Sequence, residues 1–516
     1  MQKKFVKYIT GIFIVIILLL PIGALFWGLG EPSPAWVNIR DFVLFQTIVN
    51  TGLLVFFTAL FTGIAGSFSA VFISLYNFKF KRLFSVLLIL PLAIPPYIAG
   101  FLYVDFLSFT GPLQSFLRTY TSLDIRHFSI MNLPGAIFIF TFTLYPYVYL
   151  ITRAYLKNNS LSFVENGRLL SKNTLQLLFK IVLPLLGPAI LTGLTMVSLE
   201  VVNDFGVANY FGVRTLSTLI FQAWHNMFDV YLAIRISFVL IGFVAAYFFI
   251  SRLFFRDQKY RIVSAKEKPL KPIYIKGIRA GILICFFTII TGLGFFIPFI
   301  YMITMLTETN WTLVVQLSLN TIAIVAISTI IIMLSGLYIA NLGRKAPKKI
   351  KGVLRLANIG YGLPSPVLAI GIIALFAGLN NFIPINFGFT LVMLVFAYVV
   401  KYFAPGHFNL EKGYSKVGHV YTDSSLLLGR SSAATFFKVD IFTIKNAVFS
   451  GSVLIFIDLI KELPLTLILR SFNFQTLATR TYMFAMNEQL PQAAPFSLVI
   501  VLICGSFLVV MNLLEK

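Results

Sequence analysis

The sequence predicts an all-α polytopic membrane protein of about twelve transmembrane helices, arranged as two parallel six-helix repeats. Hydrophobic residues make up 58% of its 516 residues and charged residues only 11%, whereas soluble domains carry about 25% charged residues. Long stretches without charge recur along the chain, and most could cross a bilayer, which needs roughly 20 apolar residues. These stretches do not alternate between polar and apolar residues, which argues against an outer-membrane β-barrel.

The hydrophobic runs and the polar breaks between them define the spans. The first run follows Lys3 and Lys4 but is too long for a signal peptide and lacks a small-residue cleavage site, so we interpret it as a span. A turn-rich break at 378–384 divides the uncharged run 356–400 into two spans. The predicted spans are 8–29, 43–75, 83–108, 134–152, 181–203, 230–250, 279–303, 314–342, 354–378, 388–405, 446–464 and 495–513.

The net charge of +23 does not indicate a nucleic-acid partner, because the basic residues cluster between the hydrophobic runs. The positive-inside rule places such clusters in the cytoplasm. If the N-terminus is cytoplasmic and the spans alternate, most of the 41 Lys and Arg residues fall on the inside. We therefore expect both termini to be cytoplasmic and the spans to be surrounded by membrane lipid.

An internal duplication accompanies the division of the spans into six and six. The most basic connector separates a first repeat, 1–250, from a second repeat, 279–516, and itself forms a cytoplasmic linker, 251–278. Because each repeat has six spans, the two keep the same orientation and are parallel. At an offset of 258 residues, 165–172 aligns with 423–430 and 200–204 with 458–462; 215–218 aligns with 476–479 after a three-residue slip; and 50–51 and 95–96 align with 320–321 and 365–366 at an offset of 270.

Motifs for enzymatic chemistry are absent from the sequence. It contains no G-x-x-x-x-G-K-[ST] loop for nucleotide phosphates, and its four histidines have no metal-ligand or triad spacing. We therefore predict that the chain is not an enzyme and binds no cofactor.

Two polar, helix-prone loops, 153–180 and 406–445, occupy equivalent positions on the predicted cytoplasmic face. A short helix lying there can pass force into the spans when a partner closes, provided that a small residue such as Ser171 or Gly429 lets it approach a groove. The alternative is a pair of amphipathic interfacial helices without a partner. The candidate coupling residues are Glu165, Gly167, Arg168, Ser171, Asp423, Ser425, Gly429 and Arg430.

Both loops resemble the EAA loop of bacterial importer permeases of the ATP-binding cassette (ABC) class. The first retains Glu165, Arg168 and the later Leu183-Pro184, and the second retains Gly429 but has Asp423 in place of the glutamate. The resemblance implies that two copies of a separate ATPase subunit dock on 160–175 and 418–433. ATP and Mg would then belong to that partner.

The segment 458–480 resembles the signature of the ferric-iron permease family, Lys-Glu-Leu-Pro-x-Thr-Leu-x-Leu-Arg-Pro-Phe-x-Phe-x-Thr-Leu-Ala-Thr, with Ser471 in place of a proline. The resemblance implies a permease of the bacterial cytoplasmic (inner) membrane that takes ferric iron from a periplasmic or lipid-anchored binding protein by alternating access. Permeases for thiamine, phosphonate or another small solute share this architecture. An ion-gradient-driven secondary transporter is the alternative from a different class.

Four acidic residues at equivalent places of the repeats are candidates for the translocation path, because acidic residues in spans are costly. Those four apart share a helix face, and carboxylates suit a hard cation such as Fe³⁺. We predict no firm metal site, with Glu200 and Asp458 as transient metal ligands. Alternatively, Lys461 and Arg470 neutralise the carboxylates, or the carboxylates are solvated helix ends. The four candidates are Glu200, Asp204, Asp458 and Glu462.

Overall fold

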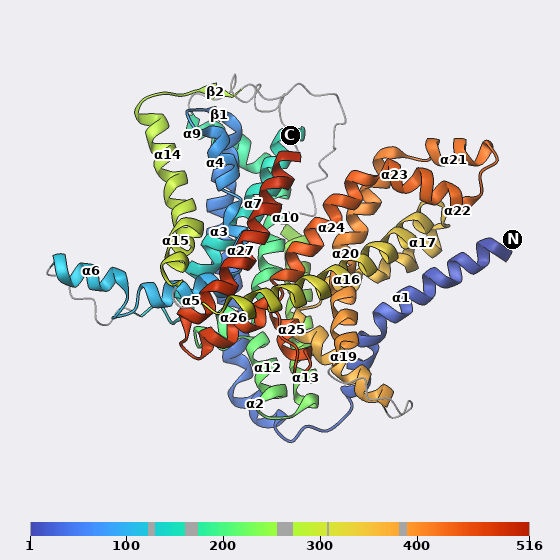
Figure 1. The fold of residues 1–516 in the computed structure, drawn as a ribbon, viewed down its shortest axis with the longest axis horizontal. Coiled ribbons are helices and arrows are strands. Elements are labelled where there is room, and N and C mark those ends of the chain that lie inside the picture. The colour runs from blue at the N-terminus through green and yellow to red at the C-terminus, as the bar shows by residue number, and fades with distance from the viewer. Residues whose placement is uncertain are drawn as a thin grey trace. The chain divides into compact units, whose positions relative to one another are not determined.

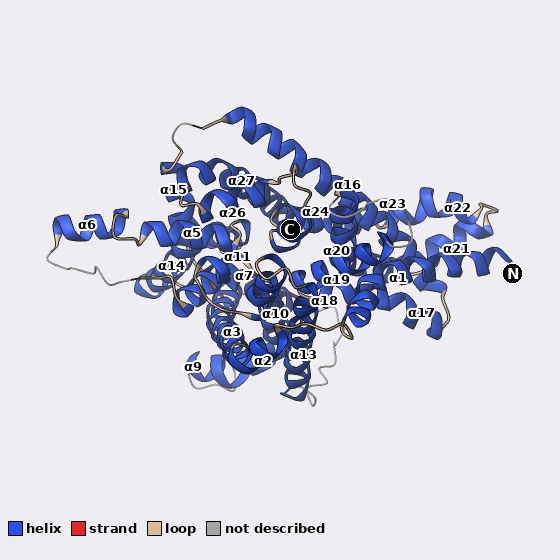
Figure 2. Cartoon of the chain, turned by 90° about the horizontal axis from the view of Figure 1, so that it is seen from below, coloured by secondary structure: helices blue, strands red, loops and turns tan. Residues whose placement is uncertain are grey.

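The computed structural model describes residues 2–121, 129–159, 174–254, 272–306, 309–380 and 390–514. Helices make up nearly all of this part of the chain, as Figure 2 shows. Contacts divide the chain into two compact units: unit 1 comprises 1–38, 219–238 and 310–480, and unit 2 comprises 39–218, 239–309 and 481–516.

The elements of the first half are shown in Figure 1 in blue to green. They are α1 (Gln2–Gly28), α2 (Trp36–Phe42), α3 (Leu44–Leu75), β1 (Tyr76–Asn77), α4 (Lys81–Leu87), the 3₁₀-helix η1 (Leu90–Ala93), α5 (Pro96–Phe106), α6 (Pro112–Tyr120), α7 (Leu133–Asn159), α9 (Thr174–Leu177), the π-helix η2 (Leu178–Val182), α10 (Leu183–Asn203), α11 (Gly206–Tyr210), α12 (Leu216–His225) and α13 (Val230–Phe254).

The elements of the second half, from β2 to α27, are also drawn in Figure 1. They are β2 (Ile273–Tyr274), α14 (Ile278–Thr291), the π-helix η3 (Gly292–Phe296), α15 (Ile297–Thr304), α16 (Trp311–Lys345), α17 (Lys348–Arg355), η4 (Leu356–Asn358), α18 (Ile359–Gly362), α19 (Ser365–Asn380), α20 (Leu391–Val417), α21 (Val420–Leu427), α22 (Ser432–Thr435), the π-helix η5 (Phe436–Asp440), α23 (Ile441–Thr443), α24 (Lys445–Ile460), α25 (Pro464–Leu469), α26 (Leu477–Met486) and α27 (Leu490–Leu514).

The number of spans agrees with the sequence. Among the described residues, nine helices are long and apolar enough to cross a membrane, and three more helix pairs qualify together but are bent at a short break. If each bent pair is one span, the total is twelve, and each predicted span corresponds to one helix or one pair. The all-α polytopic fold class is therefore confirmed.

The three bends were not expected from the sequence. The pair α4–η1 and α5 bends by 91°, and the pair α17–α18 and α19 bends by 111°. Both breaks precede a proline, Pro95 or Pro364, and a residue before proline is driven out of the helical region. Ile94 and Leu363 accordingly have ψ values of 111° and 133°. The third pair bends by 73° at Ile444, without a proline.

The duplication predicted from the sequence recurs in the elements. Helices α7 and α20 have the same length and begin at Leu133 and Leu391, which is the same offset that aligns the two loops. The π-helices η2 and η5 begin at Leu178 and Phe436, again at this offset. Helices α12 and α26 also have equal lengths, and their starts include the three-residue slip seen in the sequence. The repeats therefore share helix order and helix bounds.

Each unit contains an equivalent three-helix core. In unit 2, α3, α7 and α10 pack on one another, and Gly66 lets α3 approach the α7 backbone, where a Cβ would lie 2.7 Å from the Tyr145 carbonyl oxygen. In unit 1, the counterparts α16, α20 and α24 pack on one another. A short parallel pairing of β1 with β2, in the register Tyr76 to Ile273, adds to unit 2.

The units do not follow the sequence repeats. The first helix, α1, packs on α19 in unit 1, where a Cβ on Gly371 would lie 2.7 Å from the Pro21 carbonyl oxygen. Likewise α15 and α27 pack on α5 in unit 2. Each unit therefore combines helices from both halves of the chain. The predicted domains 1–250 and 279–516 describe the duplication and stay a prediction.

Candidate coupling and translocation sites

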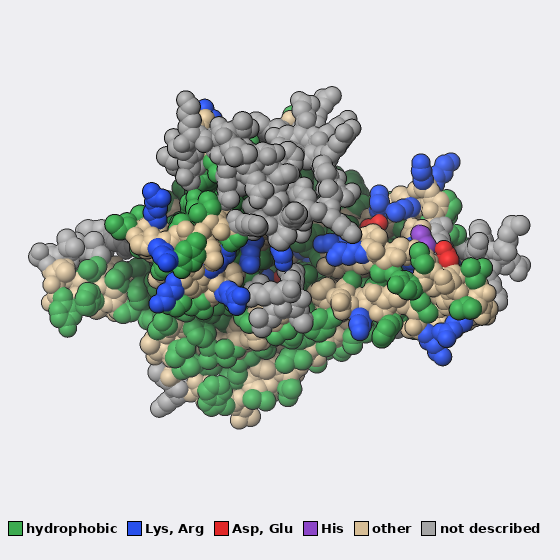
Figure 3. Space-filling model, turned by 90° about the horizontal axis from the view of Figure 1, so that it is seen from above, with side chains coloured by type: hydrophobic (Ala, Val, Ile, Leu, Met, Phe, Trp, Pro, Cys, Tyr) green, Lys and Arg blue, Asp and Glu red, His purple; other side chains and the backbone are tan. Residues whose placement is uncertain are grey.

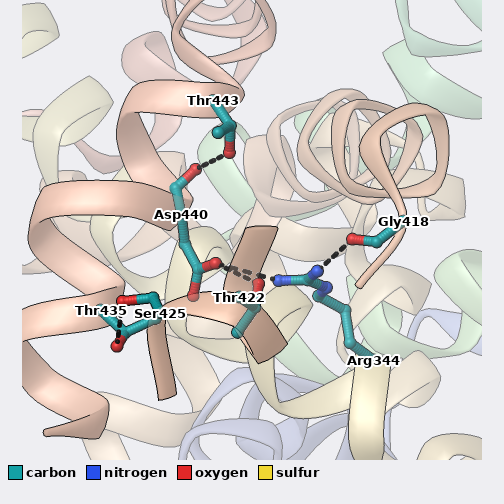
Figure 4. A network of polar contacts seen from close by, with 7 residues as sticks. All are labelled: Arg344, Gly418, Thr422, Ser425, Thr435, Asp440 and Thr443. Carbon is teal, nitrogen blue, oxygen red and sulfur yellow. Dashed lines mark hydrogen bonds and ion pairs between the residues drawn. The ribbon is translucent and has the colours of Figure 1, made fainter. Parts of the chain in front are cut away.

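The second coupling loop forms a helical hairpin of α21 and α22 in unit 1. Ser425 on α21 and Thr435 on α22 are both buried, and their hydroxyl oxygens lie 3.0 Å apart (Figure 4). Asp423 and Arg430 are exposed. Ser425 therefore holds the hairpin together, whereas Asp423 and Arg430 are accessible.

A buried charge pair fastens this hairpin to a transmembrane helix. The guanidinium of Arg344, near the end of α16, lies 3.4 Å from the Asp440 carboxylate in η5, and these side chains are only 8% and 5% exposed. Thr422 donates a hydrogen bond to the same carboxylate at 2.5 Å, and Arg344 also donates to the Gly418 carbonyl (Figure 4). Movement of the hairpin is thereby linked to α16.

Gly429 turns the chain between the two hairpin helices. Its φ is +82°, and its N–H donates to the Leu426 carbonyl at 3.0 Å, as expected for a glycine that ends a helix. A Cβ there would meet no atom within 4 Å. The glycine is therefore required by backbone conformation rather than by lack of space.

The tip of the hairpin exposes large apolar side chains. Leu427 and Leu428 are 89% and 83% exposed, and Val420 and Tyr421 at the start of α21 are exposed as well. Exposed apolar patches rimmed by polar residues are typical of interaction surfaces. The predicted residues of the first coupling loop, Glu165, Gly167, Arg168 and Ser171, lie outside the described residues.

Asp204 and Glu462 occupy equivalent positions and make the same contact. The Asp204 carboxylate accepts a hydrogen bond from the Val207 N–H at 2.7 Å. The Glu462 carboxylate accepts one from the Leu465 N–H at 3.1 Å and another from the Tyr402 hydroxyl. Each acid therefore satisfies a backbone donor at the start of the next short helix, α11 or α25, which is the usual role of a helix cap.

Glu200 and Asp458 are also equivalent but have different neighbours. Glu200 on α10 accepts a hydrogen bond of 3.4 Å from the Tyr147 hydroxyl. Asp458 on α24 forms a 3.0 Å ion pair with Lys461. The described residues include no group of three or more His, Cys, Asp or Glu that could hold a metal ion. The arrangement offers single carboxylates, not a closed metal cage.

Three charged residues at structurally important places were missed in the sequence. Arg344 and Asp440 were treated only as parts of a basic cluster and a loop. Lys401 falls within the predicted span 388–405 without a predicted role. It lies within α20, is buried, and donates to the Leu363 carbonyl at the bend between α18 and α19. The available signal was position, because charged residues next to or within a span are rare and usually have a specific partner.

Comparison with known proteins adds to this geometry. The family model described as "Binding-protein-dependent transport system inner membrane component" matches residues 62–260 and again 332–516. The chain is 24% identical over 471 residues to the Fe(3+)-transport system permease protein FbpB 2 of Haemophilus influenzae, covering 89% of this chain and 88% of that protein. It is 29% identical over 200 residues to the sulfate transport system permease protein CysT of Salmonella typhimurium, covering 38% of this chain and 69% of that protein.

The family match falls once on each repeat and includes most of the chain. It agrees with the duplicated helical core and with the twelve spans. The resemblance to importer permeases inferred from the loops is thus confirmed. The chain belongs to the family of binding-protein-dependent transport system inner membrane components, and it is a multi-pass membrane permease subunit.

Proposed function

We propose that this permease imports ferric iron by alternating access, driven by a separate ATPase. The observation that carries the proposal is the similarity to a ferric-iron permease over 89% of this chain, which includes both repeats. The sequence of 458–480 also supports it, because this segment resembles the signature of the ferric-iron permease family.

The test is uptake in proteoliposomes that contain the permease, its ATPase and its binding protein. We expect ATP-dependent accumulation of radioactive iron and none of radioactive sulfate. Sulfate is the second candidate substrate, because the sulfate permease CysT has the higher local identity, 29%. Sulfate uptake without iron uptake would overturn the iron proposal and leave the ABC permease assignment intact.

We infer that two ATPase copies dock on 160–175 and 418–433. ATP and Mg would bind to the ATPase subunits and not to this chain. The exposed apolar tip at Leu427 and Leu428 supports docking on the second segment. Replacing both leucines by serine should reduce co-purification of the ATPase, whereas Phe472→Ser, an equally exposed aromatic outside the loop, should not. Undiminished co-purification of the double-serine variant would remove this segment from the interface. Ser171→Trp tests the first segment and should do less damage if the two loops are unequal.

We infer that both termini are cytoplasmic, in the inner membrane of a bacterium, with the binding protein on the other side. Figure 3 shows Lys and Arg side chains on the surface with few acidic side chains beside them, and the positive-inside rule places such basic surface in the cytoplasm. After Cys285 and Cys504 are replaced by serine, Ala265→Cys should react only from the cytoplasm and Ser122→Cys only from outside. Reversed labelling would invert the topology.

We infer that Glu200 and Asp458 contact the passing cation, whereas Asp204 and Glu462 cap helices beside the path. The double variant Glu200→Gln with Asp458→Asn should lower iron uptake while ATP hydrolysis persists. If these carboxylates are instead structural, the variant should mainly lower the melting temperature and the yield. Unchanged uptake would exclude an acidic constriction from the mechanism.

A further inference from the structure

The two repeats contain a cleft at equivalent positions, each lined by the helix after the second span and by the fourth span. The first-repeat cleft is lined by α4 and α7 and has a volume of about 720 Å³. The second-repeat cleft is lined by α17, α16 and α20 and has a volume of about 320 Å³. Each cleft lies within one unit, so its lining is independent of how the units are placed.

The second-repeat cleft contains a carboxylate of its own between two of its cations. Lys351 and Arg355 on α17 reach the Glu411 carboxylate on α20, with nitrogen–oxygen distances of 3.8 and 3.7 Å. The carboxylate lies between the two cations, and all three side chains line the cleft. This carboxylate compensates part of the positive charge of the cleft, at distances that join α17 to α20.

At the equivalent positions the first-repeat cleft has different chemistry. The offset of 270 residues places Lys81 opposite Lys351 and Ser85 opposite Arg355, and the offset of 258 places Arg153 opposite Glu411. The carboxylate of one repeat is thus a guanidinium in the other. Lys81, Arg82 and Arg153 all line the cleft, and none of the described residues that line it is acidic.

Neutral groups hold Arg153 in place. Its guanidinium donates to the Tyr149 hydroxyl at 3.0 Å and to the Ser85 carbonyl at 3.3 Å. Arg153 is half-buried, and no ion pair among the described residues includes it, Lys81 or Arg82. Three cations therefore line one cleft, and no described residue of its lining supplies a negative charge to compensate them.

The surroundings of the cleft suit a membrane interface. Phe80 and Leu83, which flank Lys81 and Arg82 in sequence, are 54% and 53% exposed. Lys and Arg next to exposed apolar side chains are typical of protein surfaces that contact headgroups and acyl chains together. Basic pockets between transmembrane helices on the cytoplasmic side bind anionic headgroups, and Arg matches phosphate oxygens with paired hydrogen bonds.

We propose that the first-repeat cleft binds a phosphate group, which takes the place that the Glu411 carboxylate has in the second repeat. An anionic phospholipid headgroup and free inorganic phosphate are the two sources of this group. Bound phosphate compensates Lys81, Arg82 and Arg153 and joins α4 to α7 as Glu411 joins α17 to α20. The inference does not depend on the transported substrate.

The test uses the full-length chain purified in a neutral detergent, with bound lipid counted by native mass spectrometry. Phosphatidylglycerol should be retained in preference to phosphatidylcholine, and Arg153→Gln should weaken its binding about fivefold. Arg153→Glu should abolish binding without unfolding the protein, because the second repeat already has this residue. Arg355→Gln, in the other cleft, is the matched control and should leave binding unchanged.

A variant in the second-repeat cleft distinguishes a specific effect on binding from a loss of folding. Glu411→Gln should create a second phosphatidylglycerol site, a gain that misfolding cannot produce. Titration of lipid-free protein with inorganic phosphate separates the sources: a rise in melting temperature that Arg153→Glu abolishes assigns free phosphate, and lipid binding without this rise assigns the headgroup. Equal binding of lipid and of phosphate by wild type and Arg153→Glu would overturn the proposal.

Discussion

The two repeats use equivalent side chains to accept hydrogen bonds from equivalent backbone N–H groups. They differ in the positions of their charged residues. Thr51 accepts a hydrogen bond from the Leu216 N–H at 3.0 Å, and its counterpart Thr321 accepts one from the Leu477 N–H at 2.9 Å. The acids that cap α11 and α25 are equivalent as well. These contacts satisfy buried backbone groups, which any copy of this fold must do.

Two charged residues near the second coupling loop have uncharged counterparts in the first repeat. Arg344 and Asp440 of the second repeat correspond to Ser74 and Val182 in the first, which cannot form an ion pair. Ser74 donates only within its own helix, to the Ala70 carbonyl, and Val182 is packed in an apolar core. The second coupling loop therefore has a charged attachment at positions where the described part of the first repeat has uncharged residues. The comparison teaches that the two repeats share their helix order while their charged contacts differ.

Breaking the buried pair should have the largest effect. Asp440→Asn leaves the Arg344 guanidinium without its carboxylate, and we expect it to lower the free energy of unfolding by about 3–5 kcal/mol. Denaturation of the purified protein in mixed micelles measures this. The double variant Arg344→Met with Asp440→Leu should recover most of the loss, because no uncompensated charge remains. A double variant as unstable as the single one would contradict this interpretation.

The shared threonine contacts should be equal in the two repeats. Thr51→Val and Thr321→Val each leave a buried backbone N–H without its acceptor, at a cost of about 1–3 kcal/mol. The same denaturation experiment should give two values within a few tenths of a kcal/mol of each other, and Thr→Ser at either site should restore the wild-type value. A large effect in one repeat alone would show that the duplication is not energetically equivalent.

The glycine at the hairpin turn should show a conformational rather than a steric effect. Gly429→Val must adopt a positive φ at a cost of about 1–2 kcal/mol, whereas Gly429→Asn tolerates that conformation. We expect the valine variant to lose ATPase co-purification and transport while still inserting into membranes, and the asparagine variant to keep both. If both variants behave alike, the requirement is for small size.

An exposed ion pair should have the smallest effect. Arg40 donates a hydrogen bond to Asp41 at 2.7 Å, which lowers the pKa of the Asp41 carboxyl. A lowered pKa stabilises the fold above the carboxyl's unfolded pKa, and this contribution disappears as the pH falls through the folded value. Because both side chains are solvated, Asp41→Asn should not measurably change the melting temperature at neutral pH. If Asp41→Asn destabilised the protein as much as Asp440→Asn does, burial would not be what makes an ion pair important for stability.

Much of the fold could be predicted because the bilayer leaves few alternatives. A helical span needs about 20 apolar residues, so composition and run length predicted the number of spans. The duplicated motifs predicted which helices correspond. In the second coupling loop Gly429 lies at the turn, and Asp423 and Arg430 are exposed, while their role in coupling stays a prediction.

The sequence by itself determined the spans, the duplication and the family, because each depends on local composition or on residue order. Tertiary structure decided which residues meet: α1 packs on α19 rather than within its own half, Asp440 lies against Arg344, and Lys401 reaches the Leu363 carbonyl at a bend. These contacts join residues that lie far apart in the chain, as Pro21 and Gly371 do. No local pattern encodes them, because burial and charge compensation exist only once the helices have packed.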